Sequence, residues 1–466
     1  MEPRILARAE HPISRRDIDA NVLKVLYRLT GAGHLAFLVG GSVRDLMLSR
    51  RPKDFDVATS AHPQEVRDLF RNSRLIGRRF RLVHVFFERQ NVEVATFRRQ
   101  AEQVADSDDP LIRLDNTFGT PEEDAFRRDF TVNALFYDAQ SFQVIDFPGG
   151  VNDLEARLIR TIGDPEIRMR EDPVRMMRAV RFAAKLSFEI EPATRAAIER
   201  HRADLRKASV PRLVEETFRT LGQAEAAHAV VLMEELGLLE SVVPILSEHL
   251  KAGEGTLAEQ ATIRNVAALG RTIAAGAIPE RSTVLSALML DVFRCQFRRA
   301  LAERIDLLGS LRARGFARGD TEQMRLILEG FENFAAPTRR TRRLMRRPYF
   351  PDARLFFEMT APTYSIDTRR MMRFLAEPDR FAVTPAPAAA PSPTGEHRQR
   401  RRRRRARRRY GSNHAGAAAA TAIDQSGSNQ RPHPDNGSSE KGSPEKSPDG
   451  RGAVNRNSTG SERERD

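Results

Sequence analysis

The pattern of hydrophobic and polar positions changes near residue 150, from a mixture of strand-like and helix-like segments to mainly helix-like ones. In the first part, short apolar runs and alternating segments predict strands, and segments with a period near 3.6 predict helices. The predicted strands are 36–39, 53–59, 78–88 and 91–98, and the predicted helices are 21–28, 42–48 and 63–71. Residues 1–20 are charged and show no period, and the acidic, turn-rich residues 101–120 predict a mobile loop.

From Asp153 onward the strand signals fade, and longer helical patterns follow, including 171–186, 211–221 and 227–243. We therefore expect an α+β protein in which a sheet-containing domain precedes a largely α-helical region. The expected parts are an N-terminal extension (1–20), a sheet domain (21–150), a first helical region (151–215), a second helical region (216–383) and a tail (384–466).

The tail consists mainly of Pro, Ala, Ser, Gly, Asn and charged residues, so it lacks the apolar side chains needed to offset chain entropy and is expected to be disordered. Ten arginines lie within 398–409, and subtracting them from the formal net charge of +14 leaves +4 for the rest. Such a charge favours a polyanionic partner, first of all nucleic acid. Docking of an acidic partner protein or of RNA-degradation machinery is the alternative for this tail.

The single cysteine, Cys295, excludes an internal disulfide and is expected to be a small buried residue; no disulfide-linked partner is expected. No His/Cys cluster has the spacing of a zinc site along the sequence. No apolar run is long enough for a membrane span, and the N-terminus lacks the apolar core of a signal peptide. We therefore expect a cytoplasmic protein without membrane insertion.

Asp54 and Asp56 are separated by one residue in a predicted strand, so both carboxylates are expected on one face, with Phe55 on the other. Two adjacent carboxylates repel each other unless a cation lies between them, and Mg²⁺ prefers oxygen ligands of this kind. Glu93 on a neighbouring predicted strand is a candidate third ligand, or else an exposed strand glutamate.

A Gly-Gly turn precedes these aspartates, between a predicted strand and a predicted helix. Gly40 and Gly41 would let the backbone approach a phosphate, and Ser42 is a plausible N-cap whose helix directs free N–H groups at that phosphate. Arg44 would add a charge-assisted contact to a triphosphate. Together with the aspartates, the turn favours a site for nucleotidyl transfer with a nucleoside triphosphate and two Mg²⁺ ions.

Two further segments carry candidate residues. Residues 122–138 predict a helix in which Arg128 offers a cation for phosphate, while Asp129 and Asn133 lie on one face, as they also would on a salt-bridged surface helix. Residues 170–186 predict another helix, with Asp172 as N-cap and Pro173 at the first helical position.

In this second helix, arginines recur every three residues at 175, 178 and 181, and could equally face solvent. Asp172 beside Arg175 presents a hydrogen-bond acceptor next to a donor, which complements the pairing edge of adenine. Cytosine offers the same pattern, so this pair alone does not separate ATP from CTP.

Four ordered segments resemble the motifs of the bacterial class II nucleotidyltransferases, the family of CCA-adding enzymes and bacterial poly(A) polymerases. They are LVGGSVRD (38–45), DFDVAT (54–59), RRDFTVNAL (127–135) and EDPVRMMRAVRFAAKL (171–186). The resemblance implies a polymerase-β-like catalytic head, helical neck and body domains, Mg²⁺ as cofactor and ATP as substrate. It makes Asp54 and Asp56 the metal ligands and Asp129 a further active-site acid, and the third ligand stays open between Glu93 and Asp129.

The resemblance also implies that the nucleotide pocket is lined by Arg128, Asn133, Asp172, Arg175 and the nearby Arg178. Within the family, residues 8–29, 75–87 and 339–359 resemble the poly(A) polymerase branch. They imply that the chain adds AMP to RNA 3′ ends without a template. The alternatives are a CCA-adding enzyme and a catalytically silent RNA-binding adaptor.

Overall fold

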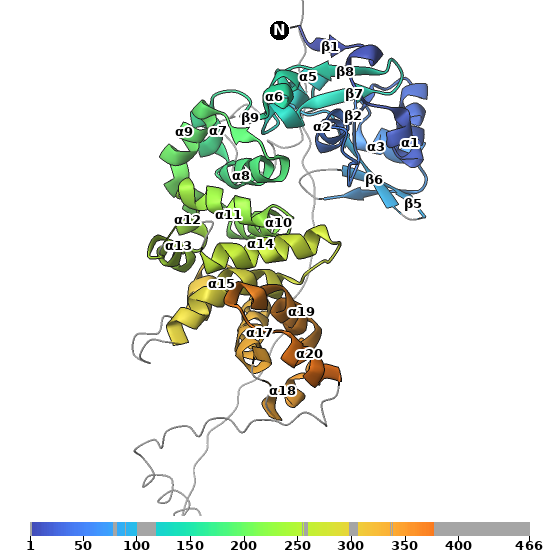
Figure 1. The fold of residues 1–466 in the computed structure, drawn as a ribbon. Helices are drawn as coiled ribbons and strands as arrows, with labels where there is room; N and C mark the ends of the chain where they lie inside the picture. The colour runs from blue at the N-terminus through green and yellow to red at the C-terminus, as the bar shows by residue number, and fades with distance from the viewer. Residues whose placement is uncertain are drawn as a thin grey trace, which may run out of the picture. The chain divides into compact units, whose positions relative to one another are not determined.

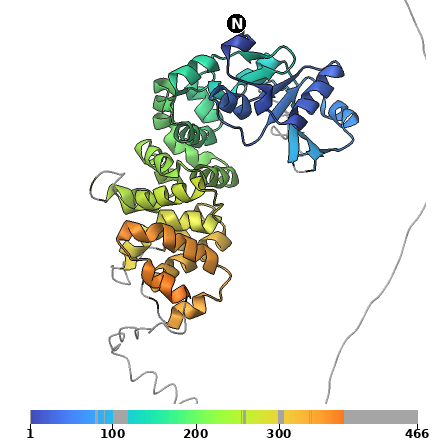
Figure 2. The same cartoon turned by 45° about the vertical axis from the view of Figure 1, so that its right-hand side comes forward.

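The structure is a computed structural model of the chain, and it describes residues 2–77, 82–88, 90–99, 118–253, 255, 260–297, 306–335, 337 and 339–376 (Figures 1 and 2). Residues 101–117 of the predicted loop and the predicted tail over 384–466 lie outside the described residues.

Eight strands in the described part of the chain form one sheet, in the order β1-β8-β7-β2-β3-β6-β5-β4. Their bounds are β1 (Arg4–Leu6), β2 (Ala36–Val39), β3 (Asp56–Thr59), β4 (Ser73–Ile76), β5 (Leu82–Phe87), β6 (Gln90–Thr96), β7 (Leu135–Asp138) and β8 (Gln143–Asp146). Neighbouring strands are antiparallel except β3 and β6, which are parallel. Because β1 pairs with β8, the charged N-terminal segment contributes a strand to the sheet.

Helices α1 (Ala20–Gly31) and α3 (Pro63–Leu69) pack on the sheet, α1 against β2, β3 and β6 and α3 against β4, β5 and β6 (Figure 1). The α1 side chains at helical spacing, Val22, Val25, Leu26 and Leu29, are buried in the main hydrophobic core. This amphipathic pattern is what predicted the helix, and the prediction is confirmed.

Residues 122–138 do not form the predicted helix. The segment contains α5 (Pro121–Phe126), the 3-10 turn η3 (Thr131–Asn133) and strand β7. β7 lies between β2 and β8 and hydrogen-bonds to both, so pairing with distant strands overrides the local helical pattern. Of the predicted strand over 78–88, residues 78–81 lie outside the described residues; the described part forms β5, which pairs with β4, a strand that the sequence did not predict.

After the sheet, the regular structure in the described residues is helical apart from the short parallel pair β9 (Leu158–Ile159) and β10 (Glu189–Ile190). Its first helices are α6 (Gly150–Ala156), α7 (Pro165–Glu171), α8 (Val174–Leu186), α9 (Pro192–His201), α10 (Val210–Leu221), α11 (Ala226–Glu235), α12 (Leu239–Val242) and α13 (Pro244–Lys251). Its later helices are α14 (Ala261–Ala274), α15 (Arg281–Phe297), α16 (Leu307–Ala313), α17 (Arg318–Ala335), α18 (Arg339–Leu344), α19 (Phe350–Thr360) and α20 (Arg369–Ala376). The predicted α+β class is confirmed. Among the described residues, none of these helices combines the length and apolarity needed to cross a bilayer.

Candidate active site

The Gly-Gly turn joins β2 to helix α2 (Gly41–Met47), as the sequence predicts. Gly40 has φ 71° and ψ −133°, a conformation that favours glycine, and a Cβ at this position would lie 3.1 Å from Nη1 of Arg128. Gly40 is the N-cap residue of α2. The prediction that Ser42 is the N-cap is therefore wrong: Ser42 lies inside the helix, and its hydroxyl donates to the carbonyl oxygen of Val39 at 2.9 Å.

Arg44 lies inside the protein at 2% exposure. Its Nε and Nη2 donate to Oδ1 of Asp45 at 2.8 and 2.6 Å, and its Nη1 donates to Oδ1 of Asn133 at 2.6 Å. The guanidinium also lies over the ring of Phe182, 5.3 Å from its centroid. These contacts hold Arg44 against the turn and leave it little freedom to reach a phosphate.

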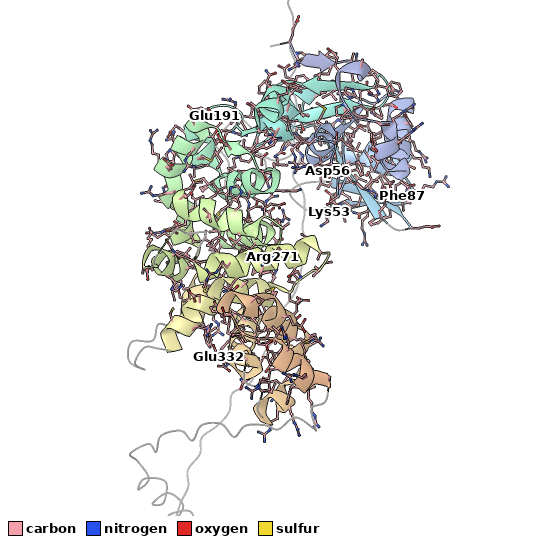
Figure 3. The ribbon with its side chains drawn as sticks, viewed as in Figure 1. Lys53, Asp56, Phe87, Glu191, Arg271 and Glu332 are labelled. Atoms are coloured by element: carbon pink, nitrogen blue, oxygen red, sulfur yellow. The ribbon has the colours of Figure 1, made fainter. Side chains whose placement is uncertain are left out.

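Three carboxylates lie at one edge of β3 and β6, and we call Asp54, Asp56 and Glu93 the acid edge. Strand β3 begins at Asp56, so Asp54 precedes the strand in which the sequence placed it. Both aspartates are exposed (Asp56 is labelled in Figure 3), and Phe55 packs against the main core. The parallel register pairs Asp56 directly with Glu93, which places their side chains on the same face of the sheet.

The charges at the acid edge are poorly balanced. Desolvation raises the pKa of Asp56, the neighbouring carboxylates of Glu93 and Asp54 raise it further, and Arg128 only partly opposes them. Glu93 has a contact on its other side, since its Oε1 lies 3.3 Å from Nε2 of His84 on β5. A divalent cation would relieve this repulsion, because carboxylate oxygens are the ligands that Mg²⁺ prefers.

Arg128 reaches the Gly-Gly turn from the loop after α5. Its Nη2 donates to Oδ2 of Asp124 at 2.8 Å, its Nη1 donates to the carbonyl oxygen of Asn133 at 3.3 Å, and it lies over the ring of Phe136. Burial alone would raise the pKa of Asp124, but Arg128 and Arg127 outweigh burial and lower it. Asp124 thus anchors Arg128 beside Gly40.

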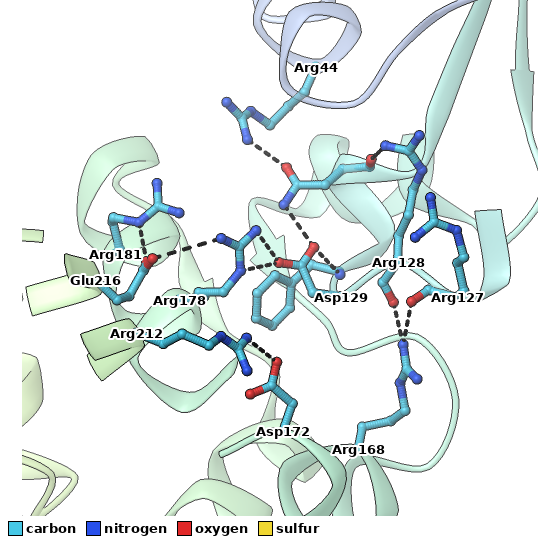
Figure 4. Close-up of polar contacts among 12 residues, drawn as sticks. Arg44, Arg127, Arg128, Asp129, Arg168, Asp172, Arg178, Arg181, Arg212 and Glu216 are labelled. Atoms are coloured by element: carbon cyan, nitrogen blue, oxygen red, sulfur yellow. Dashed lines mark hydrogen bonds and ion pairs between the residues drawn. The ribbon is translucent and has the colours of Figure 1, made fainter. Parts of the chain in front are cut away.

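The side chain of Asp129 is mostly buried, and both of its carboxylate oxygens accept hydrogen bonds (Figure 4). Its Oδ2 accepts from Nε of Arg178 at 2.7 Å, and its Oδ1 accepts from the Phe130 N–H at 2.9 Å and from Nδ2 of Asn133 at 3.3 Å. Burial would raise the pKa of Asp129, but Arg178 and these hydrogen bonds lower it.

Arg178 extends this contact into the helical region. Its Nη1 lies 3.8 Å from Oε2 of Glu216 on α10, and Arg181 donates to the other oxygen of Glu216 (Figure 4). We call Asp129, Arg178, Glu216 and Arg181 the ion-pair chain. Glu216 was not among the predicted site residues; the sequence shows it only as one polar position of an amphipathic helix.

Asp172 and Arg175 flank the start of α8, where Pro173, not Asp172, is the N-cap. That prediction is off by one residue, although Oδ1 of Asp172 still accepts from the Val174 N–H at 3.3 Å. Oδ2 of Asp172 accepts from Arg212 at 2.7 Å (Figure 4).

Arg175 has partners of its own. Its Nη1 donates to the carbonyl oxygen of Arg168 at 2.8 Å and to Oε2 of Glu171 at 3.1 Å. Both members of the predicted base-reading pair therefore have other partners in this conformation.

A cavity of about 720 Å³ opens beside Phe55, the residue between the two aspartates of the acid edge. Four cationic side chains line it, together with two aspartates, several apolar residues and Gln90. The cations are Arg16, Arg50, Arg51 and Lys53. The four cations outnumber the two aspartates, and this net positive charge favours binding of a chain of phosphates.

Comparisons with known proteins agree with the fold and the motifs. Residues 36–160 match the sequence model of the "Poly A polymerase head domain". Residues 187–250 match a second model, described as "Probable RNA and SrmB- binding site of polymerase A". The first match contains the Gly-Gly turn and the acid edge, so the region that carries the candidate site is similar to a poly(A) polymerase head domain.

The relatives identify the family more closely. Over 253 residues the chain is 49% identical to Poly(A) polymerase I of Salmonella typhi, covering 53% of this chain and 54% of that protein. Over 220 residues it is 39% identical to the CCA-adding enzyme of Bacillus velezensis, covering 47% and 54%. The crystal structure of the Bacillus stearothermophilus CCA-adding enzyme in complex with CTP superposes with a TM-score of 0.56 at 28% identity, covering 77% of this chain and 82% of that one.

The predicted resemblance to the class II nucleotidyltransferases, which include bacterial poly(A) polymerases and CCA-adding enzymes, is confirmed. The chain spans about half the length of the curated relatives it matches.

Proposed function

We propose that the chain is a template-independent polynucleotide adenylyltransferase that adds AMP from ATP to RNA 3′ ends. The observation that carries the proposal is the 41–49% identity to Poly(A) polymerase I over 252–263 residues, against 39–43% to CCA-adding enzymes over 201–228 residues. The acid edge beside a Gly-Gly turn supplies the chemistry that such a reaction needs.

Asp54, Asp56 and Glu93 are the proposed metal ligands, because they are neighbouring oxygen donors. Asp56 and Glu93 are paired on one face of the sheet, Asp54 lies just before β3, and the other two carboxylates raise the pKa of Asp56. Mg²⁺ bound there would activate the attacking 3′ hydroxyl and stabilise the departing pyrophosphate. Asp129 is the weaker candidate for the third ligand, since Arg178, Asn133 and a backbone N–H already occupy its oxygens.

The other candidate residues take roles that follow from their contacts. The backbone at Gly40 and Gly41 approaches the triphosphate, with Arg128 directly behind the turn. Arg44 and Asn133 position the turn, and Ser42 ties the start of α2 to β2.

Asp129 and Arg178 act together, with Asp129 orienting the arginine toward the nucleotide. Asp172 and Arg175 are proposed to read the base. Asp172 would release Arg212 and Arg175 would release Glu171, and both side chains would then bind the pairing edge of the base.

The partners of the reaction are ATP and RNA. We propose that the expected sheet domain is the catalytic head, and that the two helical regions bind the RNA together with the cationic cavity. The tail over 384–466 is proposed to tether RNA, and its deletion should weaken RNA affinity while nucleotide addition persists.

The deciding experiment supplies the purified chain with each labelled nucleoside triphosphate, once on a non-tRNA oligonucleotide and once on a tRNA lacking its 3′ end. We expect long adenylate tracts on the oligonucleotide with ATP alone. Addition confined to the tRNA, with CTP consumed as well as ATP, would establish the CCA-adding alternative. RNA binding without any nucleotide incorporation would establish the silent adaptor.

A further inference from the structure

Helices α13 and α15 bring together three side chains that each offer a different ligand atom. Nε2 of His249 lies 2.8 Å from Oδ2 of Asp291, and one ligand atom each of His249, Asp291 and Cys295 lies within 4.8 Å of the others. All three residues are partly buried. Along the sequence no His/Cys cluster has the spacing of a zinc site, and these three residues come together only in the folded chain.

The helical geometry explains the cluster. Asp291 and Cys295 are four residues apart on α15, so both side chains lie on one face of the helix. α13 packs against α15 and supplies His249 at its last turn. Forty-one residues separate His249 from Asp291 along the chain, and this is why no spacing rule for short zinc motifs detects the group.

The donor set indicates the class of ligand. Imidazole nitrogen, carboxylate oxygen and thiolate sulfur together are the ligands of Zn²⁺, with bonds of about 2.0–2.3 Å. In a tetrahedral site such bonds place neighbouring ligand atoms roughly 3.3–3.7 Å apart. Small rotamer adjustments of partly buried side chains are enough to reach that spacing from the observed arrangement.

We propose that His249, Asp291 and Cys295 form a Zn²⁺ site with three protein ligands and a water in the fourth position. The ion would link α13, which lies in the segment 187–250 matched to the RNA-binding model, to α15 outside that segment. Its role is to brace these two helices. The site is separate from nucleotidyl transfer, since none of its ligands belongs to the acid edge.

The test uses the full chain stripped with a chelator and then titrated with Zn²⁺ or with Co²⁺ as a spectroscopic substitute. We expect one equivalent of Zn²⁺ per chain, a higher melting temperature on binding and a thiolate-to-Co²⁺ charge-transfer band. The band reports this site alone, because the chain has one cysteine and the acid edge has only carboxylates.

Cys295→Ser should abolish the band, and His249→Gln should weaken Zn²⁺ binding at least about tenfold. The matched control is His228→Gln, an exposed histidine on α11, which should change neither. Zn²⁺ should also protect Cys295 of the unaltered protein from alkylation, a measurement that needs no variant to fold. Absence of the band together with unprotected Cys295 would reduce the cluster to an ion pair beside a thiol and overturn the proposal.

Discussion

The acid edge and the ion-pair chain both contain carboxylates, but only in the ion-pair chain are the carboxylates paired with arginines. At the acid edge, Glu93 and Asp54 add to the desolvation of Asp56 and raise its pKa. In the ion-pair chain, Arg178 outweighs the burial of Asp129 and lowers its pKa. Carboxylates that are not balanced by cationic side chains are suited to binding a metal ion, whereas carboxylates paired with arginines are already neutralised. This contrast supports the proposal that the first group binds metal and the second positions the nucleotide.

The largest expected effect is on activity at the acid edge. Asp56→Asn should reduce AMP incorporation at least about 100-fold, because the change removes a proposed metal ligand where the reaction's charge develops. Incorporation of labelled ATP at saturating Mg²⁺ measures it. Asp68→Asn, an exposed aspartate of α3 whose side chain accepts from Gln64, is the matched control and should keep full activity. Full activity of Asp56→Asn would remove the metal role from this edge.

The next effect concerns the stability of the ion-pair chain. Arg178→Met should lower the free energy of unfolding by about 3 kcal/mol, since it leaves the buried carboxylates of Asp129 and Glu216 short of a partner. Urea unfolding followed by circular dichroism measures the change. Arg195→Met is the control: Arg195 pairs with Glu199 at the surface of α9, and its loss should cost less than about 0.5 kcal/mol.

A double variant sharpens this result. In Arg178→Met/Asp129→Asn the unpaired charge of Asp129 is gone, so stability should recover by at least about 1 kcal/mol relative to Arg178→Met. Simple addition of the two single losses would show that Asp129 and Arg178 do not interact in the folded protein.

The smallest effect is a difference of sign in the pH dependence of stability. The pKa of Asp129 is lowered by folding, so its stabilising contribution is present above the unfolded value, 3.8, and is lost as pH falls through the lower folded value. The pKa of Asp56 is raised, so its ionised form costs stability at neutral pH, and this cost disappears as pH falls through the folded value, which lies above 3.8.

Metal-free Asp56→Asn should therefore be more stable than the unaltered protein at pH 7, by less than about 1 kcal/mol because solvent screens the repulsion, and Asp129→Asn should be less stable. Thermal melts between about pH 3 and pH 7 measure both differences. Both differences should shrink toward acid pH. Destabilisation by Asp56→Asn at neutral pH would show that the acid edge is already compensated without metal.

Local sequence patterns correctly predicted elements that are marked by a continuous apolar run or by a clear helical spacing of apolar residues. The apolar run over 36–39 formed β2 with the predicted bounds, and the spacing of Val22, Val25 and Leu26 within the predicted helix 21–28 indicated α1. The local pattern over 122–138 wrongly predicted a helix, because β7 is stabilised by its pairing with the distant strands β2 and β8. Local patterns also misplaced two N-caps, Ser42 two residues after the true cap Gly40 and Asp172 one residue before the true cap Pro173, because neither true cap makes a side-chain capping hydrogen bond.

The sequence by itself determined the chemistry that is available to this protein: a Gly-Gly turn, paired aspartates, recurring arginines and a family resemblance that the comparisons confirm. Only the tertiary structure decided which charges meet. The parallel register placed Glu93 beside Asp56, while packing of α8 and α10 turned Arg178 and Arg181 onto Glu216. The same holds for His249, Asp291 and Cys295, which meet because α13 packs against α15. The physical reason is that electrostatic interactions depend on distance in space, which residue spacing along the chain does not specify.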